Sequence, residues 1–411
     1  MSEGRCRDMN SATLKRVGLT FTLVLTTLAA FVPNPYPSGS ATEAPTADPV
    51  PKAKAERPDY VGDDACRSCH RQKVETFHNT AHYLTSRLPS KDSILGSFSP
   101  GANVLKTSNP DLFFRMEATE KGFFQTAVEG SPPDALSQAE RFDLVIGSGN
   151  KGQTYLFWKG RRLFELPVSY WADIGWVNSP GYLDGFPDFS RPIVPRCLEC
   201  HATYFEAIPP VSNRYGKTNF VLGITCEKCH GPGRRHVLLH SSNSVAHSGQ
   251  GMQSPVTWPR EQQIDLCAWC HAGAGKSILP AFSYLPPQPL TKYVNIPPSA
   301  PDAEVDVHGS QVQLLEKSRC FQSSTMTCTT CHDVHLPQRD LTTFSKRCLS
   351  CHTPSSCGRF ATLGNTIAQN CIDCHMPRQE TNLILFDRKG PKARPRMRNH
   401  WIKVYTEAAT R

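Results

Sequence analysis

Alternation of hydrophobic and polar positions is concentrated in one region of the chain, between residues 95 and 190. Short runs there place apolar side chains at every second position and are separated by turns, a pattern typical of half-buried strands joined by hairpins. The segment Glu120–Gly122 separates two such runs and predicts one hairpin. We expect a small antiparallel β insert over 95–190, with strands at Leu112–Ala118, Phe123–Val128, Arg141–Ile146, Gln153–Trp158 and Leu163–Val168.

A glycine-rich turn separates two of these strands. Gly147–Gly152 matches G-x-G-x-x-G, the pattern of a dinucleotide-binding loop. That loop must follow a strand and open a helix, whereas this one opens onto another strand. We therefore predict a turn whose glycines adopt unusual φ angles, and not a nucleotide site.

The remaining chain shows little regular pattern. Proline is frequent, 34 of 411 residues, which favours irregular structure. Hydrophobic residues make up 39%, which excludes complete disorder, and no run of eighteen apolar residues predicts a membrane span. Helical character appears over His70–His82.

The N-terminus predicts export. Four basic residues precede a sixteen-residue apolar run from Val17 to Val32, as in a secretory signal. We expect a signal peptide over 1–41, cleaved near Ala41, and a flexible linker over 42–59. The alternative is an uncleaved membrane anchor. Both place the rest of the chain outside the cytoplasm, in the periplasm or secreted.

Seven copies of C-x-x-C-H account for fourteen of the seventeen cysteines. This spacing is the attachment motif of c-type haem: two thiols bond one porphyrin edge, and the adjoining histidine becomes the proximal iron ligand. The seven predicted sites, in chain order, are Cys66, Cys69 and His70; Cys197, Cys200 and His201; Cys226, Cys229 and His230; Cys267, Cys270 and His271; Cys328, Cys331 and His332; Cys348, Cys351 and His352; and Cys371, Cys374 and His375.

Structural zinc is the rival interpretation of these cysteines. The gaps from Cys331 to Cys348 and from Cys351 to Cys371 come close to a zinc ribbon. A ribbon does not need histidine directly after every second cysteine, and all seven pairs have it. The sequence therefore favours seven haem c groups with their iron.

Motif spacing predicts the architecture. The first motif lies in a segment over 60–94, and the other six lie within 191–385, followed by a basic tail over 386–411 that includes a distal ligand. The segments between these motifs are too short to form a conventional hydrophobic core. We therefore expect the porphyrins to fill the interior. The predicted fold class is a multihaem cytochrome c, mainly α and irregular, haem-packed, with the small antiparallel β insert.

The sequence resembles secreted bacterial multihaem c-type cytochromes. Tyr60–Cys66, Cys226–Gly233 and Cys371–Pro377 are similar to the family that includes tetrahaem electron carriers, pentahaem nitrite reductases and octahaem hydroxylamine oxidoreductases. The nitrite reductases usually carry one motif ending in Lys at the catalytic haem. All seven motifs here end in His, which argues against that activity.

The sixth iron ligand separates a carrier from a catalyst, because a bis-His haem is closed to substrates. Eight histidines lie outside the motifs, enough for seven distal positions: His82, His236, His308, His335, His400, His78, His240 and His247. The resemblance implies His82, His236 and His400 as distal ligands. His335 is too near His332 to reach the other face of the same haem and should ligate a neighbour. His78, His240 and His247 compete for two places.

The net charge of +9 does not indicate nucleic-acid binding. Two of these charges lie in residues 1–41, and fourteen propionates of seven haems would outnumber the remaining seven. The exception is Arg388–Lys403, which has seven basic residues and no acid. This stretch either covers propionates or docks a partner or membrane surface. Redox partner proteins or quinol-linked donors are the expected partners; the oligomeric state is left open.

These observations predict extracytoplasmic electron transfer through seven haems, mostly bis-His, with no catalytic residue. One alternative is a multihaem oxidoreductase acting on a small nitrogen or sulfur compound at one open haem. Another is a haem subunit of a separate enzyme. Cys320 and Cys357 flank motifs five and six, and either form a disulfide or remain two thiols.

Overall fold

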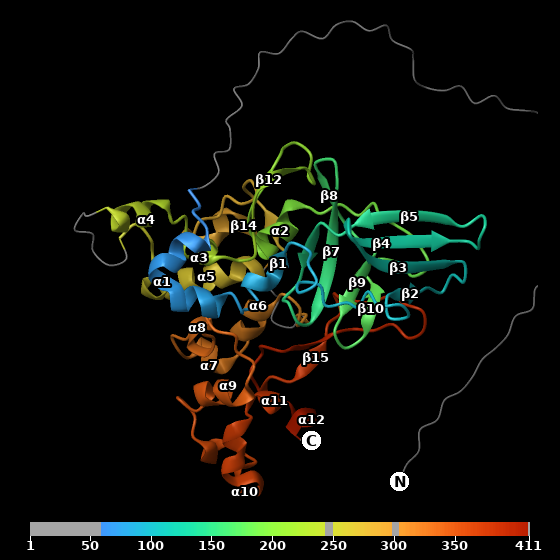
Figure 1. Ribbon diagram of the computed structural model, residues 1–411. Helices are drawn as coiled ribbons and strands as arrows, with labels where there is room; N and C mark the ends of the chain where they lie inside the picture. Colours follow the sequence, from blue (N-terminus) through green and yellow to red (C-terminus); the bar gives the residue numbers. More distant parts are fainter. Residues whose placement is uncertain (1–58, 243–249, 298–303, 410–411) are drawn as a thin grey trace, which may run out of the picture. The chain divides into compact units, whose positions relative to one another are not determined.

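The computed structural model describes residues 59–242, 250–297 and 304–409 (Figure 1). The predicted signal peptide, and the predicted linker up to residue 58, lie outside the described residues. Within the described ranges, no helix combines the length and apolarity needed to cross a membrane. All described residues belong to one compact unit, Ala55–Arg411.

A four-stranded antiparallel sheet occupies the middle of the β region. Its strands run in the order β2 (Val104–Lys106), β3 (Leu112–Thr119), β4 (Gly122–Glu129) and β5 (Leu136–Arg141). Alternate residues of β3 are buried, which confirms the period of two in the sequence. Leu112 pairs with Glu129 and Thr119 with Gly122, so β3 and β4 form the predicted hairpin.

A second antiparallel sheet follows directly. Its order is β1 (Ser86–Arg87), β6 (Leu144–Ile146), β7 (Gly152–Lys159), β9 (Val168–Trp171) and β10 (Gly175–Asn178), with β8 (Arg162–Glu165) also paired to β7. One of its faces shares a core with the first sheet through Phe114, Tyr155 and Val168. The other face contributes Leu144, Leu156 and Leu163 to a second core.

Two of the five predicted strands are divided in the structure. The run Arg141–Ile146 contains the end of β5 and all of β6, because the chain passes from one sheet to the other at Phe142 and Asp143. The run Leu163–Val168 is divided between β8 and β9 around Pro167, which has no N–H to donate to a ladder.

The turn between β6 and β7 is the glycine-rich segment predicted above. Gly147 has φ 141° and Gly149 has φ 85°, which confirms the expected glycine conformations. A Cβ at Gly147 would lie 2.1 Å from the backbone oxygen of Gly152. The two ends of the turn are therefore too close together for any side chain at this position.

Short helices make up most of the remaining structure. They are α1 (Asp63–Phe77), α2 (Pro195–His201), α3 (Cys226–His230), α4 (Arg234–Ser241), α5 (Arg260–His271), α6 (Gln311–Glu316), α7 (Arg319–Gln322), α8 (Cys328–Cys331), α9 (Leu341–Cys348), α10 (Phe360–Leu363), α11 (Ile372–His375) and α12 (Thr406–Ala409). Helix α1 ends at Phe77, so it covers much of the segment His70–His82 predicted to have helical character. Most motifs lie within a helix or at its end.

The sheet content is larger than predicted. Beyond the insert, β11 (Ala202–Ala207) and β12 (Tyr215–Leu222) form a hairpin immediately after motif two. Shorter pairs join β13 (Lys276–Ser277) to β14 (Val294–Asn295) and β15 (Arg378–Glu380) to β16 (Arg396–Arg398). The expectation of a mainly helical and irregular chain with one small β insert is therefore only partly correct.

Conventional packing is unevenly distributed along the chain. Around motif two, Tyr204, Phe205 and Tyr215 pack against the second sheet, so this part has a protein core of its own. That finding corrects the expectation that porphyrins alone fill residues 191–385. Between residues 323 and 380, in contrast, Ser345 and Ile372 are the only buried side chains. This stretch lacks an apolar core made of protein.

Candidate haem sites

Each motif lies on about one turn of helix. Residues at i, i+3 and i+4 share one side of a helix, so the two thiols and the imidazole of a C-x-x-C-H motif point the same way. Helices α2, α3, α5 and α11 end at the motif histidine, and α1 bends at His70, with φ −112° and ψ 35°. The histidine side chain is thus placed where the regular helix stops.

Four motif histidines face a second imidazole from a distant part of the chain. The ring centres are 6.3 Å apart for His70 and His236, 6.1 Å for His230 and His335, 6.3 Å for His332 and His400, and 6.1 Å for His271 and His82. The first three pairs are nearly parallel, with interplanar angles of 23°, 28° and 28°; the fourth is crossed at 78°.

These separations fit a metal ion between the rings. A metal held at ~2.0–2.1 Å by one nitrogen of each imidazole puts the ring centres about 6 Å apart. Rings in direct contact lie closer in this protein: 3.7 Å for His78 and Tyr83, and 4.4 Å for His236 and His240. The four pairs therefore leave room for one coordinated atom between them.

Hydrogen bonds orient these imidazoles. Nδ1 lies 3.0 Å from the Gln253 carbonyl in His230, 3.0 Å from the Lys403 carbonyl in His375 and 2.9 Å from the Gln250 carbonyl in His236. A carbonyl can only accept, so Nδ1 carries the proton and Nε2 is left for a metal. The same nitrogen contacts oxygen in the following pairs: His400 with Arg398, His201 with Thr85, and His271 with Gln311.

Burial favours the neutral form, which is the form that binds metals, in three of the imidazoles: His82, His201 and His400. Burial, together with neighbouring imidazoles, lowers the pKa of His82 to about 4 and that of His400 to about 4. Burial and the nearby His308 lower the pKa of His201 to about 4. His308 is thus the described non-motif histidine that acts on the motif-two imidazole.

The three competing histidines differ in their surroundings. His78 has both nitrogens engaged: Nε2 lies 3.0 Å from an Asp63 carboxylate oxygen and Nδ1 3.5 Å from the Arg67 guanidinium. His240 stacks on His236 at a ring separation of 4.4 Å. His247 lies outside the described residues. Of the two that the structure describes, neither His78 nor His240 lies opposite a motif histidine.

The motif-six and motif-seven histidines have a different environment. Five of the described non-motif histidines lie beside motifs one to five. The other two, His78 and His240, contact other groups. No described imidazole is therefore left to face His352 or His375. His375 still has the Nδ1 hydrogen bond to Lys403 that leaves Nε2 unengaged.

Thiols from different motifs lie side by side. Sγ of Cys66, Sγ of Cys226 and a carboxylate oxygen of Asp63 all lie within 4.8 Å of one another. Cys200 contacts Cys270, and Cys267 contacts Cys328. Cys348, whose pKa burial raises to about 11, is also influenced by Cys371 and Cys331. The contacts join motif one to three, two to four, and four to five, and the electrostatic influence on Cys348 indicates that motif six lies near motifs five and seven.

Two further motif cysteines, Cys69 and Cys374, lie on α1 and α11. Cys69 is exposed, and its Sγ accepts a hydrogen bond from the neighbouring Ser68 hydroxyl at 3.8 Å. Cys374 is half-buried on α11. Neither belongs to the cluster formed by Asp63 and the two thiols beside it. The assignment of Cys69 and Cys374 as haem-binding thiols stays a prediction from the C-x-x-C-H spacing.

The zinc interpretation finds no support in this arrangement. Within the described ranges, the one cluster of three or more metal-binding groups is Asp63, Cys66 and Cys226, with a single cysteine from each motif. A structural zinc ribbon needs four ligands, two from each pair. The Cys320–Cys357 disulfide is not formed either, because both residues are free cysteines.

Acidic residues inside two motifs were missed by sequence reasoning. The Glu227 carboxylate accepts hydrogen bonds from the backbone N–H groups of Val61, Gly62 and Gly233, at 2.9, 2.9 and 2.8 Å. Glu199 accepts from Phe282 N at 2.6 Å. Both are almost fully buried. A glutamate between two haem-binding cysteines was the available signal, since a charge at such a site needs partners.

Comparisons with known proteins agree with this geometry. The family model "Cytochrome c554 and c-prime" matches residues 187–231, which contain motifs two and three. A solved structure, the outer cell wall cytochrome OcwA, is similar at 16% sequence identity with a TM-score of 0.53, covering 86% of this chain and 81% of that chain. The chain has a cytochrome-like fold. No curated protein sequence matches it.

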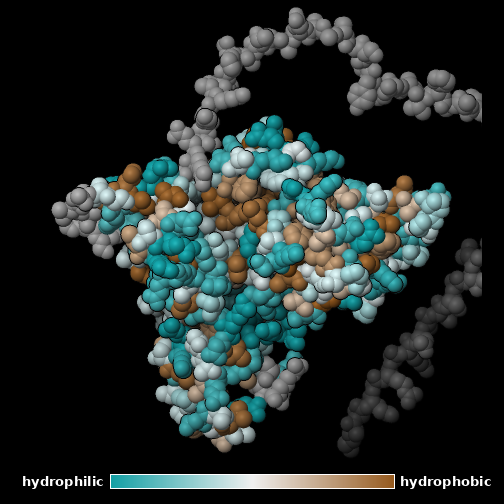
Figure 2. All heavy atoms as spheres, viewed as in Figure 1, coloured by the Kyte–Doolittle hydropathy of each residue, from teal (hydrophilic) through white to brown (hydrophobic). Residues whose placement is uncertain are grey.

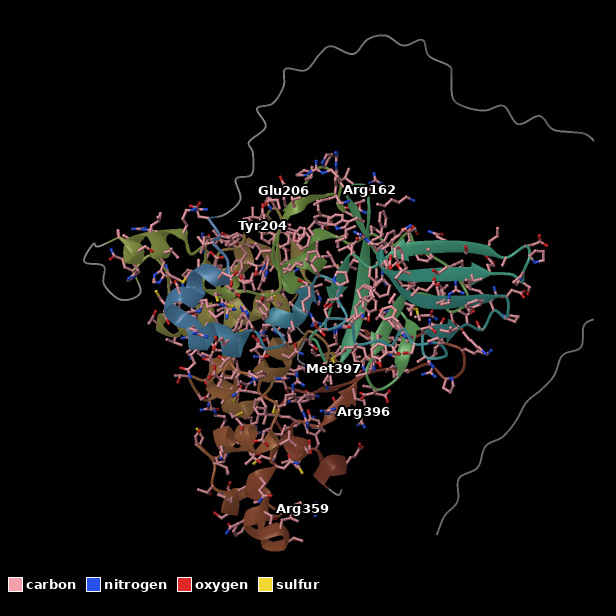
Figure 3. All side chains as sticks on the ribbon, in the orientation of Figure 1. Arg162, Tyr204, Glu206, Arg359, Arg396 and Met397 are labelled. Atoms are coloured by element: carbon pink, nitrogen blue, oxygen red, sulfur yellow. The ribbon has the colours of Figure 1, made fainter. Side chains whose placement is uncertain are left out.

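A basic cluster accompanies the last motif of this cytochrome fold. Arg378 on β15 pairs with Arg398 on β16, and both act on Lys151 of the β6–β7 turn, together with Arg339. Arg398 is held by Asp373, 2.6 Å away. Arg396 and Met397 of β16 are labelled in Figure 3, and hydrophilic side chains predominate around these strands on the face shown in Figure 2.

Proposed function

We propose that this chain is an extracytoplasmic electron carrier with seven covalently attached c-type haems, one at each motif. The four facing imidazole pairs are the observation that carries the proposal, because no other common cofactor needs a C-x-x-C-H turn opposite a second imidazole. The similarity to an outer cell wall cytochrome supports a location outside the cytoplasm.

The ring geometry supports four bis-His assignments, and we propose a fifth at motif two. We assign His236 to the haem at His70, His335 to that at His230, His82 to that at His271, and His400 to that at His332. His308 influences both His201 and His271; because His271 already faces His82, we propose His308 as the partner of His201. Each distal ligand comes from a segment that carries a different motif or follows one, so attachment of one haem constrains two segments.

Thiol contacts give the order of the haems. They connect motifs one and three, two and four, four and five, and then five, six and seven. The thiol of Cys229 also influences Cys267, which links motif three to motif four. We infer a branched path in which the fourth haem is adjacent to those of motifs two, three and five.

The residues of the chain set the properties of this path. When bound, each haem supplies one-electron redox chemistry at its iron. The Nδ1–H hydrogen bonds of His230, His236 and His375 fix the ring orientation and raise ligand basicity, and two imidazoles per iron give lower potentials than imidazole and methionine. Redox partner proteins or quinol-linked donors are the partners that we propose.

Haem stoichiometry tests the proposal. The holoprotein purified from an exporting host should keep seven haems through acid–acetone extraction and show the corresponding increase in intact mass. A mass equal to that of the polypeptide, or zinc in place of iron, would refute it. The low-temperature electron paramagnetic resonance spectrum of the oxidised protein should contain at least five low-spin haems.

A second function is favoured by one observation. His352 and His375 face no imidazole from the described residues, so we propose that one or both of these haems has an open face that binds a small nitrogen or sulfur compound. A high-spin ferric signal that shifts on adding nitrite or hydroxylamine would support an oxidoreductase. Seven low-spin signals that neither compound changes would support the carrier function and contradict the oxidoreductase.

A further inference from the structure

One fully buried serine contacts the chain segment that carries His400. Ser318 lies between α6 and α7 and has no exposed surface. Its hydroxyl donates a hydrogen bond to the His400 carbonyl at 3.3 Å and accepts one from the Ile402 N–H at 2.8 Å. Beside it, Lys317 Nζ lies 5.4 Å from the centre of the Trp401 ring. Two neighbouring residues thus hold the His400 segment, although it follows 82 residues later in the chain.

The Ser318 hydroxyl has no role in its own helix. Ser318 is the N-cap of α7, a position where a serine side chain commonly accepts a hydrogen bond from the second or third N–H of the helix. Here the side chain makes no such bond, and the Phe321 N–H donates to the Ser318 backbone carbonyl at 3.1 Å. A buried hydroxyl without a partner is costly, so the bonds to residues 400 and 402 account for a polar group at this position.

The opposite side of the same segment is bound to motif seven. The Asn399 N–H donates to the Pro377 carbonyl at 3.1 Å, and the Asn399 side chain donates to Oε1 of Gln379 on β15 at 2.6 Å. These bonds fix the segment relative to motif seven, whereas His400 faces the imidazole of motif five. Ser318 lies in the stretch that leads into motif five, so its hydroxyl provides bonds that fix His400 relative to that motif.

We propose that Ser318 positions the distal ligand of the motif-five haem. Its hydroxyl holds the backbone at His400 and at Ile402, so the peptide that bears the imidazole cannot turn away from His332. The two rings then stay 6.3 Å apart and nearly parallel, with room for one coordinated atom between them. This role rests on the proposed ligation of that haem by His332 and His400.

A poorly held distal ligand leaves the haem open for part of the time. An external ligand such as cyanide binds only the open form, so its apparent affinity is the intrinsic affinity multiplied by the open fraction. Two buried hydrogen bonds favour the closed form by a factor on the order of ten or more. Ser318→Ala removes both bonds and should therefore raise the apparent cyanide affinity of this haem about tenfold.

The test is a cyanide titration of the oxidised full-length holoprotein, followed by optical and electron paramagnetic resonance spectra. Ser318→Thr and Ser318→Val are a matched pair, because the two new side chains have nearly the same shape and only threonine keeps the hydroxyl. Ser179→Ala controls for the loss of a buried hydroxyl: Ser179 is fully buried in the β insert, where it donates to the Leu166 carbonyl at 2.7 Å. His400→Ala identifies the haem, because it removes the proposed ligand itself.

Three results are expected together. Ser318→Ala binds cyanide at one haem about tenfold more tightly than the wild type, whereas Ser179→Ala binds it as the wild type does. Ser318→Val binds cyanide more tightly than Ser318→Thr. In His400→Ala that haem is already open, so adding Ser318→Ala has no further effect. The proposal is overturned if Ser318→Thr and Ser318→Val bind cyanide equally, or if Ser318→Ala still raises the affinity in the His400→Ala background.

The same variants separate this role from the broader function. Wild-type protein without haem would refute the proposed function. If seven haems are present and His400→Ala leaves cyanide binding unchanged, the distal assignment of His400 is wrong, and the role of Ser318 with it. If His400→Ala opens one haem and Ser318→Ala changes no affinity, only the role of Ser318 is refuted. If Ser318→Ala is not recovered with its haems, the Ser318→Thr and Ser318→Val pair decides, because the added methyl group is common to both.

Discussion

At the scale of single residues, the motif histidines and their partners differ in how far the sequence specifies them. The proximal position follows from local covalent spacing, so it could be predicted for all seven motifs. The distal position depends on contacts between remote segments, such as His82 with His271, for which one sequence holds no local signal. His78 and His82 illustrate this, because they are only four residues apart on the same segment. What distinguishes them is that His78 contacts Asp63 and Arg67.

Replacing these two histidines tests the distal assignment. His82→Ala should convert one low-spin haem to high spin, because nothing else would close that face of the motif-four haem. His78→Ala is the matched control and should leave the spin states unchanged, since both its nitrogens are engaged elsewhere. Electron paramagnetic resonance of the oxidised variants is the measurement. A low-spin His82→Ala protein, or a high-spin His78→Ala protein, would contradict the assignment.

Glu165 gives a pH-dependent prediction at the same scale. Burial raises its pKa to about 7, although Arg191 lies 3.1 Å away and Thr154 donates to it. Because the folded pKa exceeds the usual value of 4.5, the folded state holds the proton more tightly, and stability falls as pH rises from about 4.5 to about 7. Above about pH 7 the folded state has lost all of the stabilisation that the proton on Glu165 provides.

Glu165→Gln should remove this dependence. We expect the free energy of unfolding, measured in urea, to fall between pH 5 and pH 8 by about 2–3 kcal/mol more in the wild type than in the variant. Subtracting the loss of the variant from that of the wild type removes the contribution of the other titrating groups. Equal losses in both proteins would show that Glu165 ionises normally in the fold.

At the scale of elements, periodicity predicted strands better than it predicted helices. The alternation of residue types located β3, β4 and β7, and in β3 the burial alternates with it. Helices such as α3 and α11 hold only four or five residues and no apolar stripe, so their positions follow from the motifs they contain. The hairpin β11–β12 was missed because it follows a motif so closely that its apolar residues, Tyr204 and Phe205, were assigned to porphyrin packing.

The β6–β7 turn provides a test of element geometry. Gly147→Ala should destabilise the protein by roughly 2 kcal/mol or more, because φ 141° is strained for alanine and its Cβ would meet the Gly152 oxygen. Gly160→Ala, with φ 62° and open space around the added Cβ, should cost only about 1 kcal/mol. Urea denaturation of the sheet, followed by tryptophan fluorescence, compares the two. If Gly147→Ala lost less stability than Gly160→Ala, the β6–β7 turn would have to open freely enough to accept the added Cβ.

At the scale of the whole molecule, two sources of core are joined in one chain. The two sheets of the β insert pack side chains such as Phe114, Phe142 and Tyr155 against one another and need no cofactor to do so. Residues 323–380 bury only Ser345 and Ile372 in the described structure, which is too little apolar surface to offset the entropy of ordering that stretch. The sequence predicted this contrast from motif density, but it could not show that the protein core extends past the insert to Tyr215.

Folding without haem should therefore be partial. When the chain is produced without residues 1–41, the predicted signal peptide, in a cytoplasm that cannot attach haem, the strands from β2 to β10 should persist as a protease-resistant fragment, since their core is complete. Residues 323–380 should be cut first, because haems five, six and seven would supply most of the apolar contact there. Limited proteolysis with mass spectrometry of the fragments, with the holoprotein as the control, measures both. Equal resistance of the two regions in the haem-free chain would show that residues 323–380 fold through contacts other than those with the porphyrins.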